Sequence, residues 1–250
     1  MSDAPLAEAF DTYFSYSLVR GDERNEIHRL RYEVYCREFG FEKDEDCPGG
    51  LERDEFDDAS WHGLLRHRGS GTAAGCVRVV PADTGPEGGL PIEKHCRESF
   101  FHPELRPDLL DRAHVCEVSR LAVHGVFRRR KGESKTPLGD VDGLDIPAEQ
   151  YRTFPLMAVS LFMAATALTG LTEKHHVFAM MEPRLARLLG RSGLTFTQVG
   201  NVQDYHGLRA AFYIHRDDAV SGLQQSAMLR HLYQRALEQL GAGFHAASPA

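Results

Sequence analysis

One uncharged segment sets the strongest limit on how this chain folds. No residue between Arg152 and Glu173 is charged, and residues 154–171 are mostly apolar. The run is barely long enough to cross a membrane, and it includes a proline, a serine, two threonines and a glycine. We therefore favour a helix buried on most sides within an α/β core over a transmembrane segment, while peripheral contact with a membrane surface stays open.

Composition and charge narrow the class of protein. The chain is 42% hydrophobic and 26% charged, which is typical of a globular protein. A formal net charge of -7 argues against nucleic acid as a partner, although a local basic patch can still bind an acidic protein. The five cysteines form no Cys-x-x-Cys pair, and the N-terminus has no basic or apolar stretch. We expect a cytoplasmic protein with no disulfide framework, zinc site or secretory signal.

The hydrophobic periodicity predicts alternating strands and helices. Strands are expected at 13–19, 61–67, 72–80, 115–123, 175–181, 194–199 and 208–215, and helices at 23–38, 154–171, 183–191 and 219–240. This order indicates one α/β domain over residues 1–250, with a mixed twisted sheet, helices on both faces and a C-terminal helix.

Two segments between these elements are predicted to be irregular. The stretch 41–58 is acidic and contains Pro48-Gly49-Gly50, so we interpret it as a loop. The stretch 125–150 is rich in Gly, Pro and charge, and we expect an exposed, mobile insertion there. Residues 83–112 should form loops with one short helix.

The strand at 115–123 carries the charges on which a functional prediction depends. Alternate side chains of a strand share a face, so Glu117 and Ser119 point one way and Arg120 points the other. In a central strand covered by helices, each ionised group needs a partner or an open cleft. The alternative is that both charges lie in water at the strand ends.

Other charged residues stand where a partner is expected. Arg31 lies within the apolar stripe of its predicted helix, where an unpaired charge is costly. Asp54 and Asp57 precede a predicted strand, and Arg78 lies inside one. Taken singly, each of these four residues fits a surface charge.

Taken together, these motifs resemble one protein family, the acyl-homoserine lactone synthases. The motifs run in the order Arg31-x-x-x-Tyr35, Phe41, Asp54-x-x-Asp57, Arg78 and Glu117-x-Ser119-Arg120. Closer relatives by resemblance are the N-acyl amino acid synthases and the acyltransferases associated with exosortase (PEP-CTERM) systems, all bacterial enzymes with a GNAT-like fold. The resemblance covers about residues 13–215. Tyr35 and Phe41 stand where lactone synthases usually have Phe and Trp, at positions that shape the amine-side pocket.

The resemblance implies an N-acyltransferase that moves a fatty acyl group from a thioester to the amine of an amino acid or related small molecule. It implies Glu117 as general base, because a partly desolvated carboxylate has a raised pKa. A β-bulge would bring Arg120 to the side of Glu117 and leave a backbone N–H for the thioester oxygen. The residues implied in catalysis are Glu117, Ser119 and Arg120, and those implied in substrate binding are Arg31, Tyr35, Phe41, Asp54, Asp57 and Arg78.

The resemblance also implies where the acyl donor lies. Strands 115–123 and 175–181 are expected to splay apart and hold the pantetheine arm, and the helix at 154–168 is expected to line an acyl tunnel. Members of this fold that use CoA bind its pyrophosphate with a Gln/Arg-x-x-Gly-x-Gly/Ala loop that leads into a helix. The nearest match, Arg129-x-x-Gly132-x-Ser134, departs at its last position and leads into a long loop. We therefore expect no bound cofactor and an acyl carrier protein as donor, with acyl-CoA as the weaker alternative.

The resemblance also implies that a basic helix face is the docking surface for an acidic carrier protein. Arg184, Arg187 and Arg191 follow an i, i+3, i+7 spacing, and Arg129 and Arg130 are further candidates. The alternative is an ordinary solvated helix face. The expected partners are an acyl carrier protein and a small amine or amino acid.

Other chemistry has weaker support in the sequence. His175 and His176 point to opposite faces of a strand, which argues against a metal site. No Gly-x-Ser-x-Gly elbow occurs, and Cys116 lies on the strand face opposite Glu117, which argues against an acyl-cysteine. Two alternatives stay open: an acyl-homoserine lactone synthase that uses S-adenosylmethionine, and a non-catalytic acyl-binding sensor.

Overall fold

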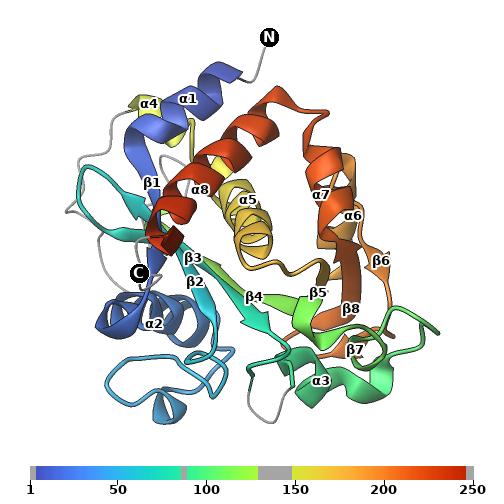
Figure 1. Ribbon diagram of the computed structural model, residues 1–250. Coiled ribbons are helices and arrows are strands. Elements are labelled where there is room, and N and C mark those ends of the chain that lie inside the picture. Colours follow the sequence, from blue (N-terminus) through green and yellow to red (C-terminus); the bar gives the residue numbers. More distant parts are fainter. Residues whose placement is uncertain (1–3, 86–88, 129–147, 246–250) are drawn as a thin grey trace.

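The computed structural model describes residues 4–85, 89–128 and 148–245, and a mixed eight-stranded sheet runs through it (Figure 1). Its strands follow the order β1-β2-β3-β4-β5-β8-β6, with β7 paired to β8 off this path. The strands are β1 (Phe14–Val19), β2 (Trp61–His67), β3 (Ala73–Pro81), β4 (Val115–Val123), β5 (His176–Met181), β6 (Thr197–Gln198), β7 (Gln203–Asp204) and β8 (Leu208–His215).

One pair of strands in the middle of the sheet is parallel, and its pairing is short. β4 pairs with β5 only from Val115 opposite His176 to Glu117 opposite Phe178, whereas the other pairs are antiparallel. Beyond Glu117 the two strands diverge, so backbone groups of β4 face a gap where a neighbouring strand would lie. The predicted splay is therefore present.

Helices cover both faces of the sheet (Figure 1). On one face, α5 packs across β2, β3 and β4 and against α8, which also lies along β1, and on the other face α2 packs on β3 and β4. The helices are α1 (Ala4–Tyr13), α2 (Arg24–Tyr32), α3 (Pro91–Cys96), α4 (Ala148–Tyr151), α5 (Leu156–Leu171), α6 (Pro183–Arg191), α7 (Arg216–Leu223) and α8 (Ala227–His245).

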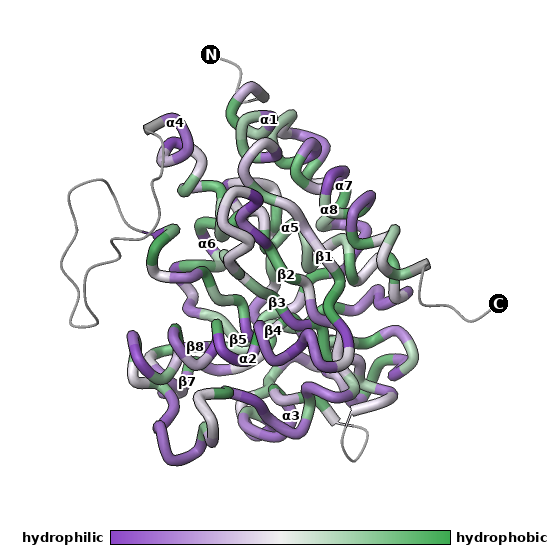
Figure 2. The backbone as a smooth tube through the Cα atoms, turned by 90° about the vertical axis from the view of Figure 1, so that its left-hand side faces the viewer, coloured by the Kyte–Doolittle hydropathy of each residue, from purple (hydrophilic) through white to green (hydrophobic). Residues whose placement is uncertain are grey.

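The uncharged segment forms α5, and most of its residues are buried. Figure 2 shows α5 as a hydrophobic helix that lies among other elements rather than at the edge of the molecule. Met163, Ala167 and Leu168 are fully buried in the main core. No helix in the described part of the chain is long and apolar enough to span a membrane.

The structure departs from the predicted elements most clearly at four places. Tyr13, predicted as the first residue of a strand, instead ends a helix, α1, that the sequence did not predict. The predicted helix at 23–38 is α-helical only as far as Tyr32 and continues as a π-helix over Glu33–Glu38. The strand predicted at 194–199 is reduced to β6, because Val199 and Gly200 both donate to the same carbonyl, that of Ala211, and the ladder cannot continue regularly.

The predicted C-terminal helix is two helices, α7 and α8. Ser226 separates them, and its hydroxyl accepts a hydrogen bond from the Leu229 N–H at the start of α8, as a helix cap does. Gly222 in α7 lies against the backbone of Gly193, so closely that a Cβ atom there would overlap the Gly193 carbonyl. The break thus allows α7 to pack beside α6 and α8 to cross α5.

Candidate active site

A buried arginine on α2 anchors the site. The Arg31 side chain is fully buried, as its place in the apolar stripe of the helix predicts. Its guanidinium binds Asp57 through two bonds, of 2.6 Å from Nη1 to Oδ1 and 3.1 Å from Nη2 to Oδ2, and its Nε donates to Glu52. Both carboxylates come from the irregular segment between α2 and β2. Arg31 therefore holds this segment against the helix.

Two further arginines extend the cluster to the sheet. Arg78 of β3 binds Asp54 and, at 2.9 Å, Asp57, while its Nε donates to the Ser119 hydroxyl at 3.1 Å. The Arg120 side chain lies 3.1 Å from Glu52, 3.2 Å from Asp54 and 3.8 Å from Glu42. The charged residues predicted from their motif order, Arg31, Asp54, Asp57, Arg78 and Arg120, thus form one network that joins α2, the acidic loop, β3 and β4.

The charges in this network hold one another ionised. Burial alone would raise the pKa of Asp57, but Arg31 and Arg78 outweigh it and hold the pKa well below its ordinary value. Burial would likewise raise the pKa of Glu52, but the charges of Arg31 and Arg120 outweigh burial and lower that pKa. Removal of one member would leave a buried charge without its partner, which typically costs about 3–5 kcal/mol. The network is therefore a rigid frame for the acidic loop.

The strand β4 contains the bulge that the sequence predicted. Cys76 faces Ala122 and Arg78 faces Ser119, so three steps along β4 correspond to two along β3. Arg120 takes up the extra residue with a φ of 50°, a left-handed conformation that side chains rarely adopt. The bulge explains how Cys116 and Ala122, which share strand parity, pack into cores on opposite faces of the sheet.

Glu117 lies just before the bulge and is nearly inaccessible, with 3% of its surface exposed. Its Oε2 accepts a bond of 2.7 Å from the Ile92 N–H, in the first turn of α3. Burial raises its pKa to about 7, although the bond from Ile92 and the positive charges of Arg78 and Arg120 oppose the rise. A pKa raised in this way suits a carboxylate to accept a proton near neutral pH.

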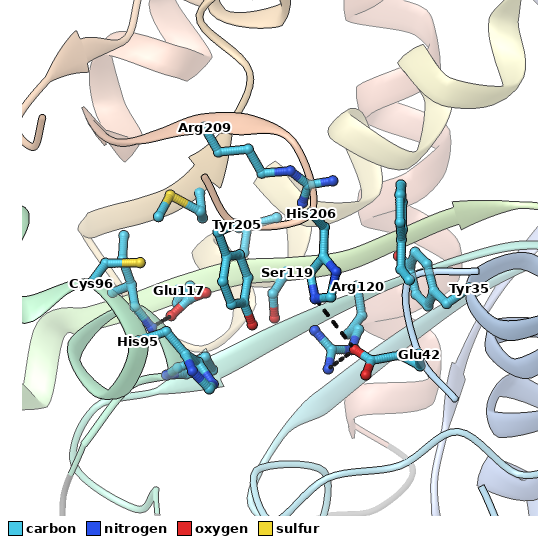
Figure 3. Close-up of a pocket in the computed structure, with 15 residues that line it drawn as sticks. Tyr35, Glu42, His95, Cys96, Glu117, Ser119, Arg120, Tyr205, His206 and Arg209 are labelled. Atoms are coloured by element: carbon cyan, nitrogen blue, oxygen red, sulfur yellow. Dashed lines mark hydrogen bonds and ion pairs between the residues drawn. The ribbon is translucent and has the colours of Figure 1, made fainter. Parts of the chain in front are cut away.

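The carboxylate faces a pocket whose empty space, counted together with its open mouth, is about 630 Å³. In Figure 3 the side chains of Glu117, Ser119 and Arg120 point into it from β4, between α3 and the segment that carries Tyr205 and His206. The pocket is lined by Tyr35, Phe41, Glu42, Pro91, Ile92, His95, Cys96, Glu117, Val118, Ser119, Arg120, Met180, Tyr205, His206 and Arg209. The bulge therefore brings both charged members of the predicted motif to one cavity.

We call the pocket that Glu117 faces the acceptor-side pocket. Two further cavities adjoin it at Val118, which lines all three. One is a groove along the splayed part of β4, bounded by Met180 of β5, by Glu182 just after that strand, and by Arg184 and Leu188 of α6. The other is an apolar cavity beneath α5, walled by residues such as Phe162 and Ala165. Its empty space, counted together with its opening, is about 470 Å³. The three cavities are thus neighbours around Val118, and residues of α5 line both the groove and the apolar cavity.

The remaining predicted residues divide into three groups. Tyr35 and Phe41 line both the pocket and the groove, and the Tyr35 hydroxyl donates to the Leu121 carbonyl at 2.9 Å, inside the bulge. Arg184, Arg187 and Arg191 are all exposed on α6 beside the groove. Arg129 and Arg130, with the Gly132 and Ser134 of the weak CoA motif, lie outside the described residues.

Sequence reasoning missed several residues of the site. Glu52 lies in an acidic run that reads as a solvated loop, yet it is 3% exposed and binds both Arg31 and Arg120. The other missed residues come from segments without a charge pattern of their own. They are His95 on α3 and Tyr205, His206 and Arg209 around the start of β8.

Comparison with known proteins agrees with this geometry. Residues 30–136 match the family described as acetyltransferase (GNAT) domain, whereas no curated protein sequence matches the chain. The match includes every residue of the ion network and all of β4. It agrees with the predicted class of enzyme, an acyltransferase.

Solved structures show the same fold at low sequence identity. The acyl-homoserine lactone synthase LasI aligns with a TM-score of 0.54 and 17% identity, over 81% of this chain and 89% of its own. FeeM, an N-acyl amino acid synthase from uncultured soil microbes, aligns with a TM-score of 0.54 and 16% identity, over 85% of this chain and 96% of its own. BjaI, a CoA-dependent acyl-homoserine lactone synthase solved with SAM and isopentyl-CoA, aligns with a TM-score of 0.54 and 16% identity, over 89% of each chain. The chain therefore has the GNAT fold in the form seen in acyl-homoserine lactone synthases and an N-acyl amino acid synthase.

Proposed function

We propose that the protein is an N-acyltransferase that transfers a fatty acyl group from an acyl carrier protein thioester to the amine of an amino acid or related small molecule. The observation that carries this proposal is the position of Glu117. Its buried carboxylate, with a pKa raised to about 7 by burial, faces a pocket that shares the lining residue Val118, beside the β4–β5 gap, with an apolar cavity. Base, acceptor space and acyl space thus meet at one bulged strand.

The reaction follows from this arrangement. The neutral amine nitrogen attacks the thioester carbonyl carbon, and a C–N bond forms while the carbonyl oxygen becomes negative. Backbone N–H groups of β4 that have no partner on β5 can stabilise this oxygen. Glu117 takes the proton from the nitrogen, directly or through a water, the C–S bond breaks, and the proton passes to the departing sulfur. The products are an amide and a free thiol.

The apolar cavity supports a fatty acyl donor rather than an acetyl group. Its walls include Phe162, Ala165 and Leu194, and only Thr166, Thr169 and Arg216 add polar groups. The two threonine hydroxyls donate to carbonyl groups of their own helix, at 2.9 Å to Phe162 and 2.8 Å to Thr166, so they do not require a polar ligand. An alkyl chain in this space would gain the free energy of leaving water.

The exposed arginines of α6 support a carrier protein as donor. Arg184 lines the groove, and Arg187 and Arg191 are exposed on the same short helix. Among the described residues, no carboxylate forms an ion pair with any of the three. A carrier protein presents an acidic surface beside its pantetheine arm, and a positive face at the groove mouth favours its docking.

The proposal is tested with purified protein, acyl carrier proteins loaded with chains of increasing length, and a panel of amino acids and amines. We expect N-acyl products in the mass spectrum together with release of the carrier thiol. Glu117→Gln should lower kcat by about 10²–10⁴-fold while the protein still binds the acyl donor. If product forms at equal rates from acyl-CoA, and reversal of Arg187 and Arg191 has no effect, the carrier assignment is wrong.

The same assay separates the two alternatives. Formation of an acyl-homoserine lactone, only when S-adenosylmethionine is present, would identify a lactone synthase. The assay includes S-adenosylmethionine because BjaI was solved with SAM. Binding of the acyl donor without turnover, unchanged by Glu117→Gln, would identify a sensor.

A further inference from the structure

One charged residue of the acceptor-side pocket stands apart from the ion network. Arg209 is the second residue of β8, and its side chain lines both the pocket of Glu117 and the adjoining groove. Figure 3 shows it on the wall of the pocket across from Arg120, beside His206. Its position on a strand of the central sheet holds it in place relative to Glu117.

Arg209 differs from Arg120 in its partners. Arg120 lies within 4 Å of three carboxylates, those of Glu42, Glu52 and Asp54. Arg209 forms no ion pair with any carboxylate in the described part of the chain, and its Nε is buried without a hydrogen-bond partner. A buried guanidinium donor is ordinarily paired. The pocket wall therefore holds one positive charge that no carboxylate of the described residues neutralises.

The guanidinium is nevertheless held in a defined orientation. Its central carbon lies 5.6 Å from the ring centre of Phe41, a cation–π contact, and Phe41 in turn lies 5.3 Å from the ring of His206. A stacked guanidinium keeps its edge free, and that edge matches the two oxygens of a carboxylate. The aromatic contact thus orders Arg209 without using its hydrogen-bond donors.

We propose that Arg209 binds the carboxylate of the acceptor, so that the acceptor is an amino acid with a free carboxylate rather than a simple amine. This inference rests on the proposed function, because it places the acceptor's amine at Glu117. The two groups line the same pocket and have opposite tasks: Glu117 removes a proton from the amine, and Arg209 neutralises the acid. A bound carboxylate would supply the partner that the guanidinium lacks.

The groove offers one competing use for the same charge. Arg209 also borders the path of the pantetheine arm, and a phosphate of the donor would satisfy it equally well in charge. The two anions belong to different substrates. Separate kinetic constants for donor and acceptor therefore distinguish them.

The test compares each amino acid of a panel with its own carboxamide, which keeps the amine and side chain but removes the negative charge. With the wild-type protein we expect KM for the preferred amino acid to be at least about tenfold lower than for its amide, since a charge-assisted bidentate pair is lost with the amide. Arg209→Gln should raise KM for the amino acid about tenfold or more, leave KM for its amide unchanged, and leave KM for the acyl donor unchanged. Arg209→Lys, which keeps the charge but not the planar fork, should fall between.

Arg230→Gln is the matched control, because Arg230 is exposed on α8 and forms no part of the three cavities. Equal use of acid and amide by the wild-type protein, or a raised KM for the donor in Arg209→Gln, would overturn the inference. Calorimetric titration of the same acids and amides, without the donor, measures carboxylate recognition independently of turnover. Absence of transfer to every amine, with selective binding of acids that depends on Arg209, would refute the proposed function but support the carboxylate site.

Discussion

Replacement of Glu117 by Gln should stabilise the protein at alkaline pH. A glutamate titrates near 4.5 in an unfolded chain, whereas burial raises the pKa of Glu117 to about 7 in the folded protein. Between these values the folded state retains a proton that the unfolded chain has released, so the free energy of unfolding falls as pH rises. Above pH 7 the full shift corresponds to about 3 kcal/mol of lost stability.

Glu117→Gln removes this penalty because the amide never ionises. The Gln oxygen can still accept the bond from the Ile92 N–H, which Glu117 accepts at 2.7 Å. Urea unfolding should therefore show the variant about 1–3 kcal/mol more stable than the wild type at pH 8.5 and nearly equal to it at pH 4.5. Loss of the base should at the same time lower kcat by about 10²–10⁴-fold, and kcat/KM of the wild type should rise with pH to a plateau above about 7.

Glu52→Gln is the control, because it changes a second buried glutamate whose pKa is shifted in the opposite direction. Arg31 and Arg120 lower the pKa of Glu52 against the effect of burial. Its loss should therefore destabilise the protein at pH 8.5, by about 3–5 kcal/mol if the pair behaves as buried pairs do. If Glu117→Gln were also less stable than the wild type at pH 8.5, Glu117 would be one more member of the ion network. The assignment as a base would then fail.

Three further changes test other parts of the structure. Arg31→Met, which leaves the buried Asp57 and Glu52 with one arginine each instead of two, should lower the free energy of unfolding by about 3–5 kcal/mol in urea. Reversal of Arg187 and Arg191 to Glu should raise KM for acyl carrier protein about tenfold at low salt, with no change in KM for acyl-pantetheine, and the difference should shrink as salt is added. Ala165→Phe should fill the apolar cavity and shift the products to shorter acyl chains, as mass spectrometry of the amides would show, without loss of folding.

The hydrophobic pattern of the sequence predicted those helices and strands whose own residues alternate between buried and exposed faces. The strand Val115–Val123 was predicted with its exact ends, because alternating residues pack on both faces. The two-residue strands β6 and β7 have no such pattern, since they exist only through pairing with β8. The end of the α-helix at Tyr32 was missed for a similar reason, as the π-helical turn that follows keeps the apolar stripe of the sequence.

Charge pairing explains both what the sequence revealed of the site and what it left out. Arg31 was suspect because a charge in an apolar stripe requires a partner, and the structure supplies it. The predicted set held three arginines and only two aspartates in the network, an excess of one positive charge that a low-dielectric interior does not tolerate. That excess was itself a signal for a third carboxylate, and Glu52, two residues before Asp54, is the nearest acidic residue on its N-terminal side.

The same reasoning applied to the acceptor-side pocket leads to a different answer. Arg209 is again a positive charge without a matching carboxylate, yet here the described part of the chain offers no acidic residue that pairs with it. A charge that is unmatched inside a ligand pocket, unlike one inside a core, can be matched by the ligand. Glu52 completes the frame of the site, and by the same argument the acceptor's carboxylate completes its pocket.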